Sequence, residues 1–281
     1  MTAPNQEQSA FWEELAPGWL AAERQTELVA GPFGAAAMGR LDLQPGQRVV
    51  DIGCGSGSTT LALAQLVGSG GEAVGIDIAP AMVRAAKDLA AGAAVPNVTF
   101  VVADPQAEPL ADAAFDAAYS RFGVMFFADP SAAFSNIRAS LRSGGRLGFS
   151  CWSNVFANEW MFVPASALVT VTGSLPPMPG PGEPGPFSLE DADALVSLLT
   201  NAGFTNVEVT PESRTIVIPG DQLESLVAMT SRVGPVREAL RTVDADTSTQ
   251  IREAVRTAMF ELVEDDELRL GAAALVVTAH A

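Results

Sequence analysis

The chain has 281 residues, of which 48% are hydrophobic, and it carries a formal net charge of −17 at pH 7. That length and composition provide for one large domain with an elaboration, or for two small domains, around a substantial core. The acidic balance argues against a nucleic-acid partner and against an anionic membrane surface, because contacts to phosphate need basic surface. There is no apolar run of about 18 residues and no signal-peptide layout, so we expect a cytoplasmic protein with no membrane partner.

Cysteine and histidine are scarce. Cys54 and Cys151 are too few for a disulfide framework or a four-ligand zinc site, and the only histidine, His280, stands next to the C-terminus. Cys54 lies inside a glycine-rich turn, where a small side chain is needed, so we interpret it as a packing residue and not as a nucleophile. The sequence therefore predicts no metal site.

The predicted elements alternate between helix and strand over the first half of the chain. Two helices come first, at residues 6–15 and 19–30, separated by a break at Pro17 and Gly18. Strands are then expected at 47–51, 73–78, 97–102, 115–119 and 146–151, and helices at 58–67, 80–90 and 130–142. This order is typical of βαβ crossovers, so the sequence predicts an α/β fold with a doubly wound parallel sheet and helices on both faces.

The alternation ends after Trp152. Residues 173–187 are dense in proline and glycine, and they are too many for a turn and too rigid for a plain linker. Such a loop is either functional or a surface excursion, and the sequence leaves both open. A helix at 189–201, a strand at 206–210, a helical stretch at 221–264 and a last strand at 273–279 complete the chain.

A glycine-rich turn between the first strand and the following helix carries the first chemical signal. Residues 49–57 read Val-Val-Asp-Ile-Gly-Cys-Gly-Ser-Gly, so the backbone can approach a ligand with no side chain between them. The glycine spacing differs from the dinucleotide pattern, in which a pyrophosphate lies at the helix N-terminus. Here Asp51 stands at the strand end, where a carboxylate accommodates a cationic amino group better than a phosphate.

Two further carboxylates end the next two strands. Asp77 lies 20 residues after Gly57 (77 − 57), at a position where a carboxylate can accept both hydroxyls of a ribose. Asp104 follows the third strand, where it can accept from the exocyclic amine of adenine. Taken singly, each aspartate is as well explained by a helix cap or a solvated strand end. Together with Asp51 they predict a nucleoside ligand that bears an amino group and no phosphate.

With these features the chain resembles the class I methyltransferases, and within them the type-11/25 group that includes quinone-biosynthesis and natural-product enzymes. The family's motifs fall at 49–57, 75–78, 101–104, 115–127 and 141–147, and its tail at 186–189, 202–204 and 276–279. The similarity thus covers about residues 10–281. It implies a mostly parallel seven-stranded sheet between two helical layers, with S-adenosylmethionine as the cofactor and S-adenosylhomocysteine as the product.

The resemblance also implies which residues contact the methionine part of the cofactor. The glycines at 53, 55 and 57 would pass along it, and Asp51 would support its ammonium group directly or through water. Ser120, after the fourth strand, would lie near the sulfonium and the substrate. In this family the N-terminal helices fold over the cofactor, which places Trp19 beside it.

The adenosine part has its own implied contacts. Asp77 would bind the ribose, Ile78 and Met82 would flank the adenine, and Asp104 would accept from its amine. One position departs from the family pattern. Adenine N1 often accepts from the backbone N–H after the acidic residue, but Pro105 has none, and Gln106 is the substitute that the sequence offers.

Aromatic residues gather where the substrate is expected. Phe122 and Phe126 follow the fourth strand, Trp152 and Trp160 follow the fifth, and Trp12 lies on the first helix. Any one of them can simply be part of the core between the helices and the sheet. As a set, they predict an apolar or aromatic methyl acceptor of small size, enclosed by a lid.

No catalytic residue stands out. Methyl transfer is an in-line displacement that depends on positioning and on exclusion of water, and it needs a base only when the nucleophile is protonated. His280 is terminal, Tyr119 lies inside a strand, and Glu159 has no distinguishing context. We therefore expect an acceptor that ionises readily or is already nucleophilic, or else a carboxylate that the sequence does not identify.

These interpretations divide the chain into parts. We predict an N-terminal helical cap (1–34), a cofactor-binding core (35–152), a Pro/Gly-rich loop on the substrate side (153–187), the end of the core sheet (188–211 and 272–281) and a helical lid inserted before the last strand (212–271). The oligomeric state is not predicted.

Other functions fit the sequence less well. The chain lacks the glycine spacing of a nicotinamide-dependent reductase. It also lacks the motif that a nucleic-acid methyltransferase carries after the fourth strand, and its net negative charge is wrong for a nucleic-acid substrate. A protein methyltransferase is disfavoured by the apolar lid. The alternative of a different class is a non-catalytic S-adenosylmethionine-binding protein or partner subunit, which the poor supply of bases keeps open.

Overall fold

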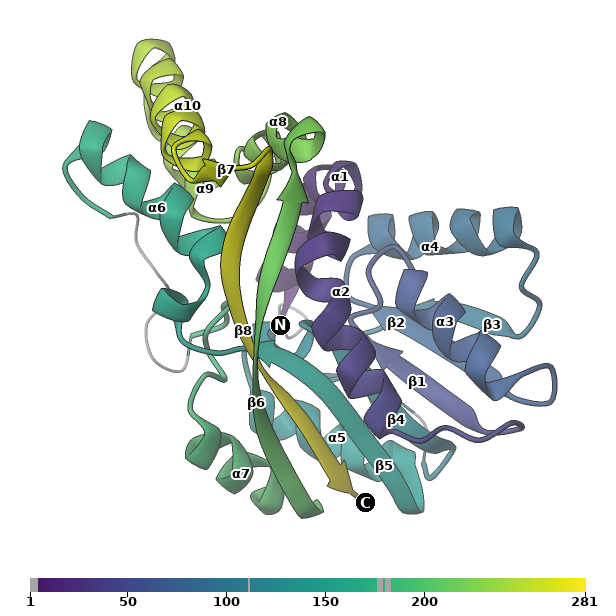
Figure 1. The fold of residues 1–281 in the computed structure, drawn as a ribbon. Helices are drawn as coiled ribbons and strands as arrows, with labels where there is room; N and C mark the ends of the chain where they lie inside the picture. Colours follow the sequence, from purple (N-terminus) through teal and green to yellow (C-terminus); the bar gives the residue numbers. More distant parts are fainter. Residues whose placement is uncertain (1–4, 111, 176–178, 180–182) are drawn as a thin grey trace.

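The computed structural model describes residues 5–110, 112–175, 179 and 183–281. Its strands form one sheet in the order β3-β2-β1-β4-β5-β8-β6, with β7 paired to β8 (Figure 1). The first five strands in this order are mutually parallel, and β8 runs antiparallel to both β5 and β6. The predicted doubly wound, mostly parallel sheet is confirmed. It has eight strands where seven are expected, because the two-residue β7 pairs beside β8.

The bounds of the elements are as follows. The strands are β1 (Arg48–Ile52), β2 (Glu72–Asp77), β3 (Val98–Val102), β4 (Phe115–Arg121), β5 (Leu141–Trp152), β6 (Thr205–Pro219), β7 (Val263–Glu264) and β8 (Glu267–His280). The α-helices are α1 (Gln6–Ala21), α2 (Glu23–Arg40), α3 (Ser58–Val67), α4 (Pro80–Ala93), α5 (Pro130–Ser140), α6 (Glu159–Thr172), α7 (Ala192–Asn201), α8 (Gly220–Thr230), α9 (Pro235–Leu240) and α10 (Ala245–Phe260). None of the described helices is long and apolar enough to cross a membrane.

The central strands are apolar on both faces, as expected of a sheet covered by helices on each side. Alternate residues point to opposite layers. Val49 and Tyr119 pack in one core with the α2 and α3 side chains Leu41 and Leu63. On the other face, the core around Val50 includes α5 and α7 side chains. The glycine-rich turn thus joins a strand and a helix that are both held by packing.

The first helix continues through the predicted break. α1 extends to Ala21 with Pro17 inside it, and the chain turns at Ala22. A proline inside a helix costs about 3 kcal/mol, and the packing of Trp12 and Trp19 against Ala79 and Met82 offsets this cost. Gly18 does not stop the helix either. A Cβ atom there would lie 2.9 Å from the carbonyl oxygen of Arg232, so glycine permits a close approach.

The region 153–187 is only partly a loop. Its residues 159–172 form α6, in which the buried residues Met161, Ala165 and Leu168 recur at helical spacing. This helix packs mainly against α10. The sequence analysis missed this helix because Pro164 and three valines weaken its propensity. Residues 176–178 and 180–182 of the Pro/Gly-rich loop lie outside the described residues.

The hairpin that carries the lid is much longer than expected. β6 and β8 pair from Thr205 with His280 to Pro219 with Glu267, so residues 212–219 and 267–271 are strand rather than lid. Both strands extend beyond the parallel strands toward α8 and α10 (Figure 1). The helical insertion therefore comprises residues 220–266, and we call these residues the lid.

Candidate cofactor and substrate site

One cavity of about 600 Å³ lies at the carboxyl ends of β1, β2 and β4. Its floor includes Ile52 and Asp77, and its roof comes from α1, the start of α2, α6, α8 and α9. In an open α/β sheet, ligands bind outside the carboxyl ends of the strands. Most of the residues predicted for the cofactor and all of those predicted for the substrate line this one space.

Two of the three predicted glycines line the cavity. Gly53 and Gly55 have φ values of 69° and 55° and belong to the lining, and a Cβ atom at Gly55 would meet no protein atom within 4 Å. Gly57 does not line the cavity. With a φ of 90°, it packs so closely that a Cβ atom would lie 2.8 Å from that of Ala86 and 3.0 Å from the ring of Phe100. Its contribution in this structure is to seat α3 against α4, and its contact with the cofactor stays a prediction.

Asp51 is buried behind the glycine-rich turn and is not part of the lining. Its Oδ2 accepts hydrogen bonds from the hydroxyls of Thr59 (2.6 Å) and Thr60 (2.7 Å), and its Oδ1 has no partner among the described residues. Burial raises the pKa of this carboxyl to about 6, although the two hydroxyls oppose the rise. An unpartnered buried oxygen needs a donor. This position fits the indirect, water-mediated form of the predicted ammonium contact.

The raised pKa of Asp51 predicts a pH dependence of folding. Between the ordinary aspartate pKa near 3.8 and the folded value of about 6, the folded state holds the proton and the unfolded state does not. The free energy of unfolding therefore falls as pH rises through this window, by about 3 kcal/mol from this group. In Asp51→Asn we expect this decrease to disappear. Urea titrations at pH 4 and pH 7 measure it, and equal pH dependence of both proteins would contradict the assignment.

Asp77 lines the cavity and holds its floor together. Its Oδ2 accepts from the backbone N–H of Gly55 (3.0 Å), and its Oδ1 accepts from that of Ala79 (2.9 Å). Burial raises the pKa of this carboxyl, and the two backbone donors oppose the rise. Each oxygen retains a second lone pair, so both can still accept from a diol. Ile78 and Met82, predicted to flank the adenine, line the cavity next to it.

The third predicted carboxylate, that of Asp104, also lines the cavity and has one oxygen without a hydrogen-bond partner among the described residues. Asp104 is 8% exposed, and its Oδ2 is buried with no partner in the described chain. Its Oδ1 accepts from the backbone N–H of Gln106 (3.0 Å) and from its Nε2 (3.1 Å). The unpartnered oxygen fits an amine donor such as that of adenine. Gln106 lines the cavity, as does Pro105. Its backbone N–H and one N–H of its amide are used, so only the second N–H of the amide is left for the predicted contact with adenine N1.

Ser120 has a structural role at the ends of two strands. It is fully buried, it is not in the lining, and its Oγ donates to the carbonyl oxygen of Ile52 at 2.8 Å. Ser120 Oγ also accepts from the backbone N–H of Gly123 at 3.3 Å. The serine thus ties the ends of β1 and β4 together, and its position beside the sulfonium stays a prediction.

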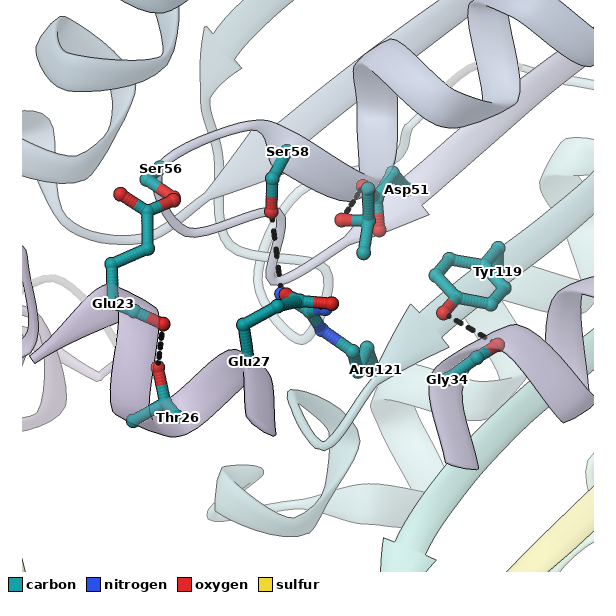
Figure 2. A network of polar contacts seen from close by, with 10 residues as sticks. Glu23, Thr26, Glu27, Gly34, Asp51, Ser56, Ser58, Tyr119 and Arg121 are labelled. Carbon is teal, nitrogen blue, oxygen red and sulfur yellow. Dashed lines mark hydrogen bonds and ion pairs between the residues drawn. The ribbon is translucent and has the colours of Figure 1, made fainter. Parts of the chain in front are cut away.

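Two charged residues that the sequence analysis missed line the cavity beside the glycine-rich turn. Glu23, at the start of α2, accepts from the hydroxyl of Ser56 within that turn (Figure 2). Arg121, at the end of β4, forms an ion pair with Glu27 (Nη1 to Oε2, 2.5 Å) and donates to Ser58 Oγ at 3.3 Å (Figure 2). A carboxylate and a guanidinium at one end of a cavity complement an amino-acid group. The sequence signal that could have identified Arg121 is its place at the carboxyl end of a strand.

A glycine on α2 makes room for this arrangement. A Cβ atom at Gly34 would lie 2.5 Å from Cδ of Arg121 and 2.9 Å from Oη of Tyr119, whose hydroxyl donates to the Gly34 carbonyl. We expect Gly34→Ala to lower the free energy of unfolding by about 1–3 kcal/mol through overpacking. Gly39, on the same helix, has nothing within 4 Å, so Gly39→Ala should raise it by about 0.5–1 kcal/mol. Denaturant titration compares the two, and shifts of equal sign would contradict this account.

All five predicted aromatic residues line the same part of the cavity, and we call them the aromatic chamber: Trp12, Phe122, Phe126, Trp152 and Trp160. The rings of Phe122 and Trp152 stack with centroids 3.8 Å apart, and Trp12 meets Phe126 edge-on at 4.7 Å. Trp160 lies 5.1 Å from Trp152. Trp19, which is predicted to lie beside the cofactor, is on α1 and also lines the cavity. The chamber is open to a ligand and is not only core.

No base for proton removal lies in the chamber among the described residues. The carboxylates of the lining are Glu23, Asp77, Asp104 and Glu238, and Glu238 is exposed and paired with Arg237. The other groups considered in the sequence lie elsewhere. Glu159 accepts from the backbone N–H of Gly271, Tyr119 is buried in the sheet, and His280 is exposed. Burial raises the pKa of Cys54, in keeping with a packing role. Within the described part of the chain, no cluster of ligands is placed to hold a metal ion.

Comparisons with known proteins agree with this geometry. The family profile described as "Methyltransferase domain" matches residues 49–145. "Aklanonic acid methyltransferase DauC" of Streptomyces sp. (strain C5) is 34% identical over 134 residues, which are 47% of this chain and 60% of DauC. The chain therefore aligns with less than two thirds of the length of that relative.

Solved structures share the fold at low identity. The BH2331 protein of Bacillus halodurans C-125 superposes with a TM-score of 0.57 at 18% identity, over 88% of this chain and 97% of the other. Phosphoethanolamine N-methyltransferase 2 of Haemonchus contortus, solved with S-adenosyl-L-methionine, superposes with a TM-score of 0.52 at 17% identity, over 88% of this chain and 51% of the other. At these identities the similarity concerns the fold alone.

Proposed function

We propose that the whole chain is an S-adenosylmethionine-dependent methyltransferase acting on a small, apolar or aromatic molecule, and the match of residues 49–145 to a methyltransferase domain supports this. The observation that carries the proposal is that one cavity is lined by Asp77, by Asp104 with its unpartnered oxygen and by the aromatic chamber. When bound, S-adenosylmethionine supplies a methyl carbon activated by positive sulfur, and the bond to the acceptor forms as the carbon–sulfur bond breaks.

The residues of the cavity divide the binding of the cofactor among them. Asp104 would accept from the adenine amine and Asp77 from the ribose hydroxyls, since both present oxygens to the cavity or its wall. Glu23 and Arg121 would hold the amino-acid end as a complementary pair of charges. Three separated anchors fix the direction of the ligand, which is what an in-line displacement requires.

The aromatic chamber would hold the acceptor. Phe122 and Trp152 are already stacked, so a planar ring can extend the stack or lie edge-on to Trp12 or Trp160. A long cationic peptide finds few charges there. DauC is named for its action on aklanonic acid rather than on a protein or a nucleic acid, which supports the same direction. The absence of a base in the aromatic chamber, among the described residues, favours an acceptor that is ionised or already nucleophilic at neutral pH.

The proposal is tested by following transfer of labelled methyl from S-adenosylmethionine to a panel of acceptors. The panel contains planar hydroxylated aromatic acids and quinols, with ethanolamine phosphate, a basic peptide and DNA as contrasting acceptors. We expect transfer to the planar aromatic compounds. Transfer to the peptide or to DNA would contradict the proposed acceptor class.

The second candidate is a non-catalytic binding protein, and the lack of a base in the chamber is the observation that favours it. The two candidates differ in one result. Binding of S-adenosylmethionine together with no methylation of any aromatic acceptor would favour the non-catalytic protein, whereas methylation of one acceptor excludes it.

A further inference from the structure

The adenine end of the cavity has an acceptor for the base but no free backbone donor from the loop beside it. Asp104 Oδ2 is free to accept, yet Pro105 has no N–H, and the backbone N–H of Gln106 and one N–H of its side-chain amide donate to Asp104 Oδ1. Gln106 Oε1 accepts from the backbone N–H of Asp129 at 2.6 Å, which keeps this side chain in place. A ring nitrogen of adenine buried here would lack a hydrogen bond, and a buried acceptor without a partner costs free energy.

A polar side chain on the opposite wall is unpartnered. Gln8, on α1, lines the cavity, and its Oε1 is buried with no hydrogen-bond partner in the described residues. A buried carboxamide oxygen of this kind calls for an explanation, because such groups are nearly always satisfied. Gln8 takes no part in the contacts that hold α1 in place.

The neighbours of Gln8 place it at the adenine end. Ser9 Oγ donates to the carbonyl oxygen of Ile78 at 3.2 Å, and Glu13 Oε2 accepts from the backbone N–H of Ala81 at 2.7 Å. One turn after Gln8 on the same face, Trp12 meets the ring of Phe126. Farther along the chain, Glu23 reaches Ser56 in the glycine-rich turn. The N-terminal helices thus follow the cavity from the base to the amino-acid end, with Gln8 at the base.

We propose that Gln8 recognises the adenine ring: its unpartnered Oε1 accepts one hydrogen of the amine and its Nε2 donates to N1, while Asp104 accepts the other hydrogen of the amine. A carboxamide carries both a donor and an acceptor, so the free end of Gln8 matches the edge of adenine that Asp104 leaves unread. The side chain of the cap helix thereby replaces the backbone N–H that Pro105 lacks. This inference rests on the cofactor of the proposed function and assigns one further binding residue to it.

The test is calorimetric binding of S-adenosylhomocysteine and of its 1-deaza analogue, in which C–H replaces N1. We expect the wild-type protein to bind the 1-deaza analogue about five- to tenfold more weakly, as for loss of one hydrogen bond. Gln8→Leu should bind S-adenosylhomocysteine more weakly by at least the same factor and show no further loss with the analogue. The 3-deaza analogue, which keeps N1, and Gln6→Leu, an exposed glutamine of the same helix, are the controls.

Each outcome decides the matter. Equal affinity of the wild-type protein for S-adenosylhomocysteine and its 1-deaza analogue would overturn the proposal, as would a further loss in Gln8→Leu. If Gln8→Leu does not fold, Gln8→Glu serves instead. It should shift preference toward S-inosylhomocysteine, whose N1–H donates, and an unchanged preference would overturn the assignment. Failure of the wild-type protein to bind S-adenosylhomocysteine at all would instead count against the proposed function.

Discussion

Replacement of Asp77 by asparagine is expected to weaken the binding of S-adenosylmethionine about 100-fold. The reason is that both carboxylate oxygens would accept from the ribose, and a hydrogen bond to a charged acceptor contributes about 1.5–3 kcal/mol. Loss of the charge weakens both bonds, which amounts to about 3 kcal/mol. Asparagine also replaces one acceptor by a donor, opposite the N–H of Gly55 or of Ala79. Isothermal titration calorimetry gives the two dissociation constants.

A matched control for this change is Asp129→Asn. Asp129 caps α5 by accepting from the N–H of Ala132 at 2.9 Å, it does not line the cavity, and asparagine caps a helix equally well. This variant should bind the cofactor as the wild-type protein does. If Asp77→Asn also bound with unchanged affinity, Asp77 would be only a support for the glycine-rich turn and not a ligand of the ribose.

Replacement of Trp152 by alanine is expected to lower the free energy of unfolding by about 3–5 kcal/mol. Trp152 is 5% exposed and lies among three rings, stacked on Phe122 and in contact with Phe33 and Trp160. Its removal leaves a void between the sheet and the roof of the cavity. At about 2–4 °C per kcal/mol, the midpoint of thermal unfolding should fall by about 10 °C. Circular dichroism during heating measures this shift.

Phe156→Ala is the comparison for this prediction, since Phe156 follows the same strand but is 70% exposed. A change at such a position should alter the free energy of unfolding by no more than about 0.5 kcal/mol. If the two alanine variants melted at the same temperature, the stack of rings would not be part of the folded core. In Trp152→Ala we also expect weaker binding of the aromatic acceptor, because the stack is the wall on which it would lie.

Local sequence patterns were sufficient to predict the sheet, the glycine-rich turn and the alternation of helices with parallel strands. Strand and helix periodicity act over neighbouring residues, so β1, α3 and β2 follow directly from their apolar patterns. Asp77 and Asp104 could be placed in one cavity because parallel strands end at the same edge. Four of the five aromatic residues of the chamber were found for the same reason, because Phe122 and Phe126 follow β4, Trp152 ends β5 and Trp160 follows it.

Other features depend on contacts between segments far apart in the sequence. Periodicity does not reveal that α1 continues through Pro17, or that β6 and β8 extend into a long hairpin, because packing on remote residues decides both. Gly57 and Ser120 have the right spacing for the ligand, and in this structure they contact neighbouring elements.

Glu23, Arg121 and Gln8 illustrate the same limit from the opposite direction. Glu23 and Gln8 carry no motif, and they meet the cavity only because the N-terminal helices cross the edge of the sheet. Arg121 lies at the end of β4, and its ion pair with Glu27 of α2 depends on the same helices. The sequence by itself therefore determined the class of fold, the class of cofactor and most of the residues on the floor of the cavity. The tertiary structure decided which side chains roof the cavity, because that roof is made by helices whose positions are set by long-range packing rather than by their own residues.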